Sequence, residues 1–229
     1  MKKNTRRKYL IPAVACLVVM AGIVYYYFFA SMAAGNETRY VYIDTDDTVD
    51  SVYTKLADVS SSNGMEGFKT LVRHSHYADN IRTGRYAIKP GEGAFTVFRH
   101  MKNGLQSPVS LTVPSVRTLD RLAAELSKRL MVDSAAIYEA LSDEAICKKY
   151  GYDTATVAAL FIPNTYDIYW NVSVEKLLDR MKKENHNFWS GQREEKARAM
   201  KLTPVEVTTL ASIIDEETAN DGEKPMVAG

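Results

Sequence analysis

Three consecutive acidic residues, Asp215, Glu216 and Glu217, form the part of this sequence best suited to acid–base chemistry. They lie near the end of a segment, Leu202 to Gly222, that has the pattern of one amphipathic helix. At about 100° per residue, Glu217 lies nearly in line with Leu210 on the apolar face, whereas Asp215 and Glu216 point away from it. An ionised carboxylate against an apolar face is costly, so we expect the pKa of Glu217 to be raised. A general acid that works near neutral pH needs such a pKa.

The helix that would carry these acids has a signal at each end. Thr203 and Glu206 have the spacing of a capping box, with Pro204 at the first helical position, and residues 220–222 (Asn-Asp-Gly) are a stop signal. We expect one face to be buried in a core, formed by Val207, Leu210, Ala211, Ile214 and Thr218. The alternative is that Glu217 is a solvated residue at the rim of the helix or a partner in a salt bridge.

A second stretch, Phe161 to Trp170 (FIPNTYDIYW), has the composition of a sugar-binding segment. Pro163 to Tyr166 predicts a turn, and the residues after it predict an extended chain. Asn164, Thr165 and Tyr166 supply neutral hydrogen-bonding groups and one aromatic face, which suits an uncharged polymer better than a phosphate. The alternative is a turn in which Tyr166 and Trp170 only fill a core.

Both stretches resemble motifs of one protein family. LASIIDEETANDGEKPMVAG (210–229) and LFIPNTYDIYW (160–170) are similar to the signatures of the MltG (YceG-like) endolytic murein transglycosylases, and the resemblance covers roughly residues 40–229. It implies that Glu217 is the catalytic residue and that no metal or cofactor takes part. Many members have Glu at the position of Asp215, but Asp215 is a shorter acid on the other face. The implied substrate-binding residues are Asn164, Thr165, Tyr166 and Thr218.

The resemblance also implies a reaction that needs only one protein carboxylate. In a lytic transglycosylase, the C6 hydroxyl of N-acetylmuramic acid attacks its own anomeric carbon, which gives a 1,6-anhydro end. One rival is a hydrolase that uses Glu217 with Asp215 or Glu216, as most glycosidases use two carboxylates. Another is a non-catalytic, membrane-anchored peptidoglycan-binding or scaffold protein. The family continues beyond the motif in which this chain ends, so we expect an incomplete catalytic domain.

The N-terminal region predicts a membrane anchor. Residues 10–30 form a run without a charged residue that is long enough for a bilayer-spanning helix, and three tyrosines lie near its far end. We expect the helix to cross the cell inner membrane once. The basic residues before it predict that the N-terminus lies in the cytoplasm and that the body lies outside it. The alternative is a signal peptide cleaved near residues 31–33. Five Lys and Arg residues precede the first acid, so the net charge of +1 leaves −4 for the remainder, which argues against nucleic-acid binding.

Cysteine and histidine patterns predict neither a disulfide nor a metal site. Cys16 lies inside the apolar run and Cys147 is alone in the body, so they cannot pair within one folded monomer. The four histidines lack paired-ligand spacing, and Gly91-Glu92-Gly93 reads as a turn and not as a phosphate loop. The family resemblance implies that the substrate is a peptidoglycan glycan strand and that peptidoglycan synthases are candidate partners.

The remaining patterns predict an α+β protein in five parts. A strand at Tyr40–Ile43 with a helix from Thr48, and a strand near Tyr86 with a helix near Phe95, both resemble the opening of a LysM module. An ordinary strand–turn–helix without sugar affinity is the alternative. We expect Ser60–Gly64 to be a break, and we expect the helix near Phe95 to stop at Asn103-Gly104. Val109–Val113 predicts a strand, and residues 119–131 predict an amphipathic helix. The predicted parts are a basic tail (1–9), a transmembrane helix (10–30), a linker (31–39), a LysM-like subdomain (40–106) and a YceG-like catalytic domain (107–229).

Overall fold

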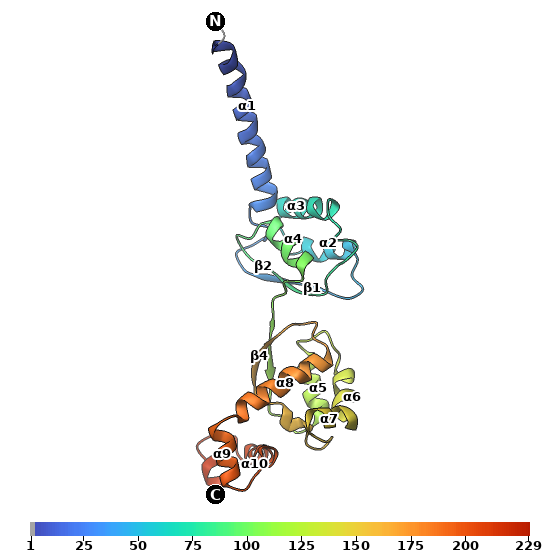
Figure 1. Ribbon diagram of the computed structural model, residues 1–229, viewed down its shortest axis with the longest axis vertical. Helices are drawn as coiled ribbons and strands as arrows, with labels where there is room; N and C mark the ends of the chain where they lie inside the picture. The colour runs from blue at the N-terminus through green and yellow to red at the C-terminus, as the bar shows by residue number, and fades with distance from the viewer. Residues whose placement is uncertain (1–2) are drawn as a thin grey trace. The chain divides into compact units, whose positions relative to one another are not determined.

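The chain folds into two units, and the boundary between them along the chain falls between Pro108 and Val109 (Figure 1). The computed structural model describes residues 3–229, with side chains from residue 9 onward. Of the basic tail predicted for residues 1–9, residues 1 and 2 lie outside the described residues, and the backbone of residues 3–9 is helical. Both units combine helices with a two-stranded antiparallel sheet, as the sequence predicts for a mixed protein. We refer to them as unit 1 and unit 2.

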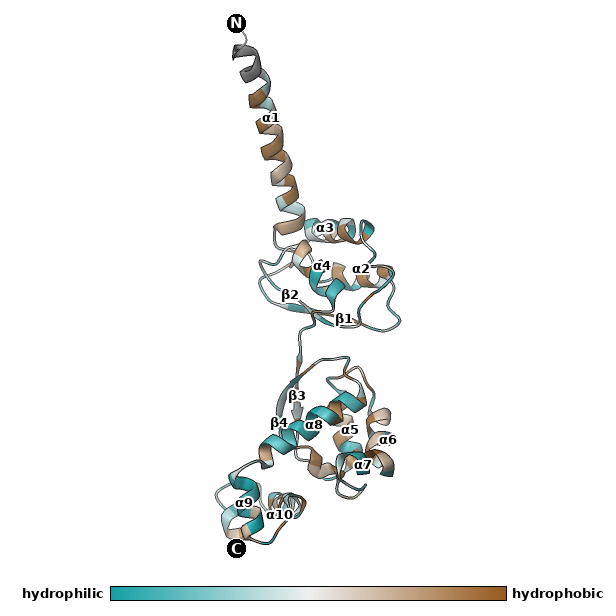
Figure 2. Cartoon of the chain, in the orientation of Figure 1, coloured by the Kyte–Doolittle hydropathy of each residue, from teal (hydrophilic) through white to brown (hydrophobic). Residues whose placement is uncertain are grey.

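Unit 1 begins with a long apolar helix. Helix α1 (Lys3–Val24) continues into a π-helical segment, η1 (Tyr25–Phe29). Within them, Tyr9–Phe29 has a mean hydropathy of 2.1, is unburied, and is long and apolar enough to cross a membrane, a property that a signal sequence shares. It is the one such helix among the described residues, and in Figure 2 most of its ribbon has the brown colour of hydrophobic residues.

The body of unit 1 is a small sheet covered by helices. Strands β1 (Arg39–Ile43) and β2 (Gly84–Ile88) pair antiparallel, with Val41 opposite Tyr86. Alternate residues of β1 face the core, as the period of two requires. Helices α2 (Val49–Ala57) and α3 (Ser62–Arg73) lie between the strands in sequence, and α4 (Ala94–Asn103) follows. Fully buried core side chains include Ile43, Val52, Leu56, Phe68, Ile88 and Met101.

Two expectations for unit 1 are wrong. Residues 31–39 are not a free linker throughout, because Met32 is fully buried, and its amide donates to the Glu92 carbonyl at 2.8 Å. The stretch 60–64 is not simply a break, because the Ser61 hydroxyl caps α3 and the helix starts at the next residue. At Met32 a contact with a distant residue outweighs the polar local composition, whereas at residues 60–64 the polar residues themselves supply a local helix cap. The predicted stop of α4 is confirmed, with Gly104 in the left-handed region (φ 69°).

Unit 2 packs helices around a second small sheet. Strands β3 (Val109–Val113) and β4 (Asn164–Ile168) are antiparallel, with Leu111 opposite Tyr166. Strand β4 therefore starts inside the segment predicted to be a turn. The intervening elements are α5 (Leu119–Ser127), α6 (Ser134–Ser142), α7 (Glu144–Tyr150) and the 3₁₀-helix η2 (Val157–Leu160). Helix α5 ends before residue 131, but its predicted apolar face is buried at Leu122, Ala123 and Leu126.

The C-terminal part of unit 2 is a chain of helices. The long α8 (Val174–Trp189) packs its Leu177, Leu178 and Met181 into the core. The helices after it are α9 (Gln192–Ala199), α10 (Pro204–Glu217) and α11 (Lys224–Val227). Together these three helices bury only Ala197.

Candidate active site

Helix α10 carries the three acids and starts as predicted. The Thr203 hydroxyl accepts from the Glu206 amide at 3.2 Å, and the Glu206 carboxylate accepts from the Thr203 amide at 2.7 Å. This reciprocal capping box satisfies two backbone groups that a helix start otherwise leaves unpaired. The helix ends earlier than predicted, at Glu217, because Thr218 takes an extended conformation. Glu217 is therefore the last helical residue.

The predicted burial of α10 is wrong. None of its residues is buried; Leu210 is 47% exposed and Ile213 is 53% exposed. Val207 and Ile214 are half-buried, and Glu217 is exposed. Helix α10 contacts α9, α11 and η2, and its apolar stripe is only partly covered within residues 3–229. The described residues thus lack the apolar enclosure that we expected around Glu217.

The two neighbours of Glu217 are committed to cations. The Lys224 ammonium lies 2.6 Å from the Asp215 carboxylate, and this hydrogen bond, with a further one from Ser115, lowers the pKa of Asp215. The Arg117 guanidinium pairs with Glu216 and lowers the pKa of that carboxyl. Both acids are thus held in the ionised form.

Glu217 differs from both neighbours, since it makes no hydrogen bond or ion pair among the described residues. Its carboxylate is open to solvent and to a ligand. The residue after it, Thr218, is half-buried, and its hydroxyl donates to the Glu223 carboxylate at 2.9 Å. Of the three consecutive acids, only Glu217 is available to act on a bound molecule.

The second predicted stretch is split between the surface and the core. Asn164 and Thr165 are exposed, and the Thr165 hydroxyl lies 2.9 Å from that of Thr112 on β3. Tyr166 is only 6% exposed, and its hydroxyl donates to the Ile162 carbonyl at 2.7 Å. A ring enclosed in this way cannot stack on a sugar, so the expectation of an open aromatic face at Tyr166 is wrong. Tyr166 fills the core of unit 2.

The exposed aromatic side chain of this segment is Tyr169, which the sequence reasoning missed. It is 55% exposed. Along β4, Tyr166 and Ile168 are buried and Thr165 and Asp167 are exposed, so Tyr169 continues the outward series just past the strand. The alternation of a strand is the signal that would have found it.

The two stretches meet at the end of β3. Val113, the last residue of β3, is the cross-strand partner of Asn164. Ser115 lies two residues beyond Val113, at most about 7 Å along the chain, and its side chain helps to lower the pKa of Asp215. Arg117, a little further on, holds Glu216. The segment after β3 therefore links the exposed end of β4 to the end of α10 that carries Glu217.

No group of three or more His, Cys, Asp and Glu side chains in the described part of the chain could hold a metal ion. Cys147 is buried, with its thiol donating to the Leu141 carbonyl, and burial raises its pKa. The available polar groups near Glu217 are thus hydroxyls, amides and paired charges. Such a set can bind a neutral polyol and transfer a proton to it.

Comparison with known proteins gives a match to a family model and a likeness to a solved structure. A family model described as the YceG-like family matches residues 41–229. Among solved structures, a yceG-like protein from Listeria monocytogenes is similar at 19% sequence identity and a TM-score of 0.46, covering 83% of this chain and 67% of that one. No curated protein matches the chain.

Proposed function

The chain belongs to the YceG-like family, and we propose that it is a membrane-anchored endolytic murein transglycosylase. Its substrate would be a glycan strand of peptidoglycan, cut between N-acetylmuramic acid and N-acetylglucosamine. The observation that carries the proposal is the position of Glu217. It is an unpaired, accessible carboxylate inside the family match, linked through the segment after β3 to the polar end of β4.

In the proposed reaction, Glu217 acts first as an acid and then as a base. It gives a proton to the glycosidic oxygen as the bond to the anomeric carbon breaks, and that oxygen leaves as a hydroxyl of N-acetylglucosamine. The C6 hydroxyl of the same muramic acid bonds to the anomeric carbon and returns its proton to Glu217. No water is consumed, and the product has a 1,6-anhydro end. One carboxylate suffices because the nucleophile belongs to the substrate.

The ion pairs of Asp215 and Glu216 favour Glu217 over its neighbours as the proton donor. A carboxylate that accepts hydrogen bonds from a cation is stabilised in the ionised form and gives up no proton near neutral pH. Asn164 and Thr165, both exposed, would hydrogen-bond the sugar, and Thr218 would support the catalytic residue from the adjacent position. The buried Tyr166 would hold β4 in place.

We also propose where the protein lies and what unit 1 does. The apolar helix would anchor the chain once in the inner membrane, with the N-terminus in the cytoplasm, and with the rest of unit 1 and all of unit 2 outside the cytoplasm. The order β1-α2-α3-β2 supports a LysM-like glycan-binding role for residues 40–106. Residues 107–229 would then be the catalytic part. A body held close to the membrane favours newly made strands and contact with peptidoglycan synthases.

The exposure of Glu217 favours a second candidate function. An acid without an apolar wall is a weak proton donor to an ether oxygen near neutral pH, and α10 supplies no such wall among the described residues. The alternative is a non-catalytic, membrane-anchored protein that binds peptidoglycan or serves as a scaffold for wall synthesis. It would use the same exposed polar residues without cleaving the strand.

Mass analysis of digested glycan strands separates these candidates. Transglycosylation gives anhydro ends, whereas hydrolysis by a carboxylate pair gives reducing ends. We expect Glu217→Gln to fold and to lose release of anhydro products, while the matched Glu216→Gln variant keeps it. Equal activity of Glu217→Gln and the parent chain would refute the assignment. Retention on peptidoglycan in both variants, without cleavage by either or by the parent, would establish the binding protein instead.

A further inference from the structure

The junction between the apolar helix and the rest of unit 1 is a packed joint. Gly67 on α3 and Gly93 before α4 leave room for the backbone of η1: a Cβ on Gly67 would lie 2.0 Å from the Tyr27 carbonyl oxygen, and one on Gly93 would lie 2.5 Å from that of Phe28. Such close approach is open only to glycine. The segment η1 and the helices α3 and α4 are therefore packed together as one body.

Hydrogen bonds on both sides of the joint hold the chain in register. The Asn63 side-chain amide donates to the Tyr26 carbonyl at 2.8 Å. Just past the helix, the Ser61 amide donates to the Met32 carbonyl at 2.7 Å, and the Gly91 amide donates to the Ser31 hydroxyl at 3.1 Å. Figure 1 shows α3 lying across the end of α1, and η1 contacts both α3 and α4. The body of unit 1 thus begins where the apolar helix ends.

The length of the apolar segment fixes where that end would lie in a bilayer. Tyr9–Phe29 contains 21 residues, or about 31 Å of helix, which matches a hydrocarbon core of about 30 Å. Phe29 would then lie at the boundary with the headgroups. The ring of Phe95 on α4 is 6.0 Å from that of Phe29, centroid to centroid, and is 43% exposed. Phe95 belongs to the folded body, yet it must lie at the same depth.

We propose that unit 1 docks directly on the outer surface of the bilayer through this face, which consists of Tyr25, Tyr26, Phe29, Phe95 and the side of α3 around Asn63. The occupant is the lipid headgroup region. The four aromatic side chains are 43–65% exposed and continuous with the apolar helix, and aromatic rings are favoured at that depth. The inference rests on the proposed membrane anchoring, and it adds that the folded body contacts the lipid.

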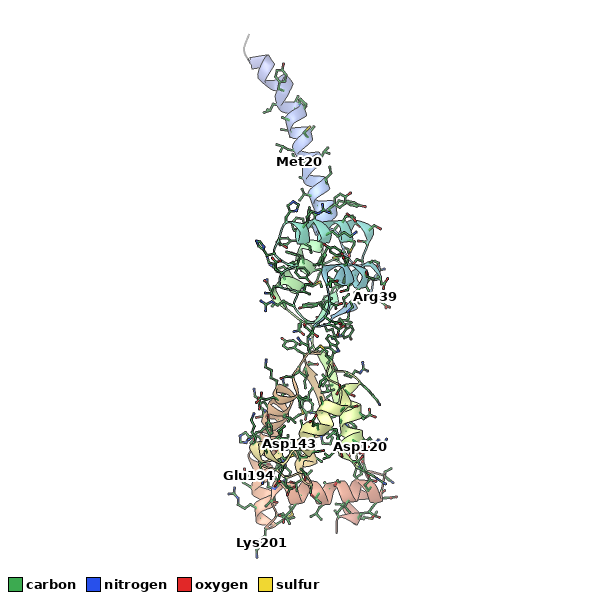
Figure 3. The ribbon with its side chains drawn as sticks, turned by 90° about the vertical axis from the view of Figure 1, so that its right-hand side faces the viewer. Met20, Arg39, Asp120, Asp143, Glu194 and Lys201 are labelled. Atoms are coloured by element: carbon green, nitrogen blue, oxygen red, sulfur yellow. The ribbon has the colours of Figure 1, made fainter. Side chains whose placement is uncertain are left out.

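A dye at three positions of the reconstituted chain tests the docking. One cysteine for labelling is introduced at a time. The sites are Met20 on α1, Phe95 on the docking face, and Arg39, which lies on the side of unit 1 away from α1 (Figure 3). Cys16 is replaced by Ala, and Cys147 is kept because its side chain is fully buried. The labelled variants are placed one copy per lipid nanodisc. Quenching is measured with iodide in the water and with nitroxide-labelled lipid headgroups.

With Phe95→Cys, we expect several-fold weaker iodide quenching and several-fold stronger headgroup-nitroxide quenching than with Arg39→Cys, and with Met20→Cys we expect no iodide quenching. A shielded Met20 with a Phe95 site that behaves like Arg39 would overturn the docking and leave the anchor intact. A Phe95 site shielded from both quenchers would assign the face to protein packing and also overturn it. An iodide-accessible Met20 would refute the anchor and the docking together.

Discussion

Replacing Gly67 with Ala should loosen the packing of η1 against α3 within unit 1. The new Cβ would lie 2.0 Å from the Tyr27 carbonyl oxygen and 2.9 Å from its carbon, and these are backbone atoms that cannot rotate away. Such overpacking costs about 1–3 kcal/mol. Alanine returns up to about 1 kcal/mol through its higher helix propensity in α3. The steric cost is larger, so we expect a net local destabilisation of about 1–2 kcal/mol.

Amide hydrogen exchange of the chain in nanodiscs measures this loss. A local opening free energy that falls by 1–2 kcal/mol speeds exchange about 5- to 30-fold, and the effect should be confined to peptides from η1 and α3. Peptides from α8 in unit 2 serve as the internal reference. The matched control is Gly22→Ala, the same change in a helix where nothing lies within 4 Å of the added Cβ.

The result that would refute this reasoning is unchanged or slower exchange of α3 in Gly67→Ala. Slower exchange would mean that helix propensity alone acts at this position, so that the close backbone approach does not exist in solution. Faster exchange in the Gly22→Ala control as well would point to a general effect on the anchor and not to the joint. The proposed docking of unit 1 on the membrane requires a tight joint in the parent chain, and therefore faster exchange of α3 in Gly67→Ala. A joint that is already loose would let the body leave the bilayer surface.

Three further predictions concern unit 2. Arg117→Ala should raise the pKa of Glu216 toward its ordinary value, which carboxyl NMR titration measures; since the pair lowers that pKa, its stabilisation is present at neutral pH and is lost as the pH falls through the lowered pKa. Thr203→Ala removes half of the capping box and should cost about 0.5–2 kcal/mol, read as faster exchange in the first turn of α10. Tyr166→Phe removes the hydroxyl's bond to the Ile162 carbonyl and should cost about 1 kcal/mol in denaturant unfolding, while glycan cleavage by the folded variant stays unchanged; a selective loss of cleavage would show that Tyr166 touches substrate.

Local signals in the sequence predicted the ends of many elements correctly. Thr48 and Thr203 cap helices as their side chains predict, and Gly104 ends α4. These features depend on groups only three or four residues apart, so the sequence states them directly. The strands β1 and β3 were likewise visible from their apolar and β-branched residues, since alternate positions must face a core.

Features that depend on distant partners were predicted less well. Met32 lies in a polar stretch that suggested a linker, but residues 61 and 92 bind its backbone and bury it. The aromatic role given to Tyr166 failed because the pairing of β4 with β3 turns that ring inward. The apolar stripe of α10 is real in sequence, yet a stripe indicates only that a face favours burial. It does not say which part of the molecule, or which ligand, covers it.

The arrangement around α10 narrows how Glu217 could become an effective acid. Asp215 and Glu216 pair with Lys224 and Arg117 at the end of the helix, and this arrangement leaves Glu217 exposed. The enclosure that a proton donor needs must therefore be brought to it. The candidates are a bound glycan lying against the end of β4 and a protein surface packed on Leu210 and Ile213, which are about half exposed. Because either would remove water from the same carboxylate, we expect proton transfer to require that this face of α10 be covered, with the helix itself unchanged.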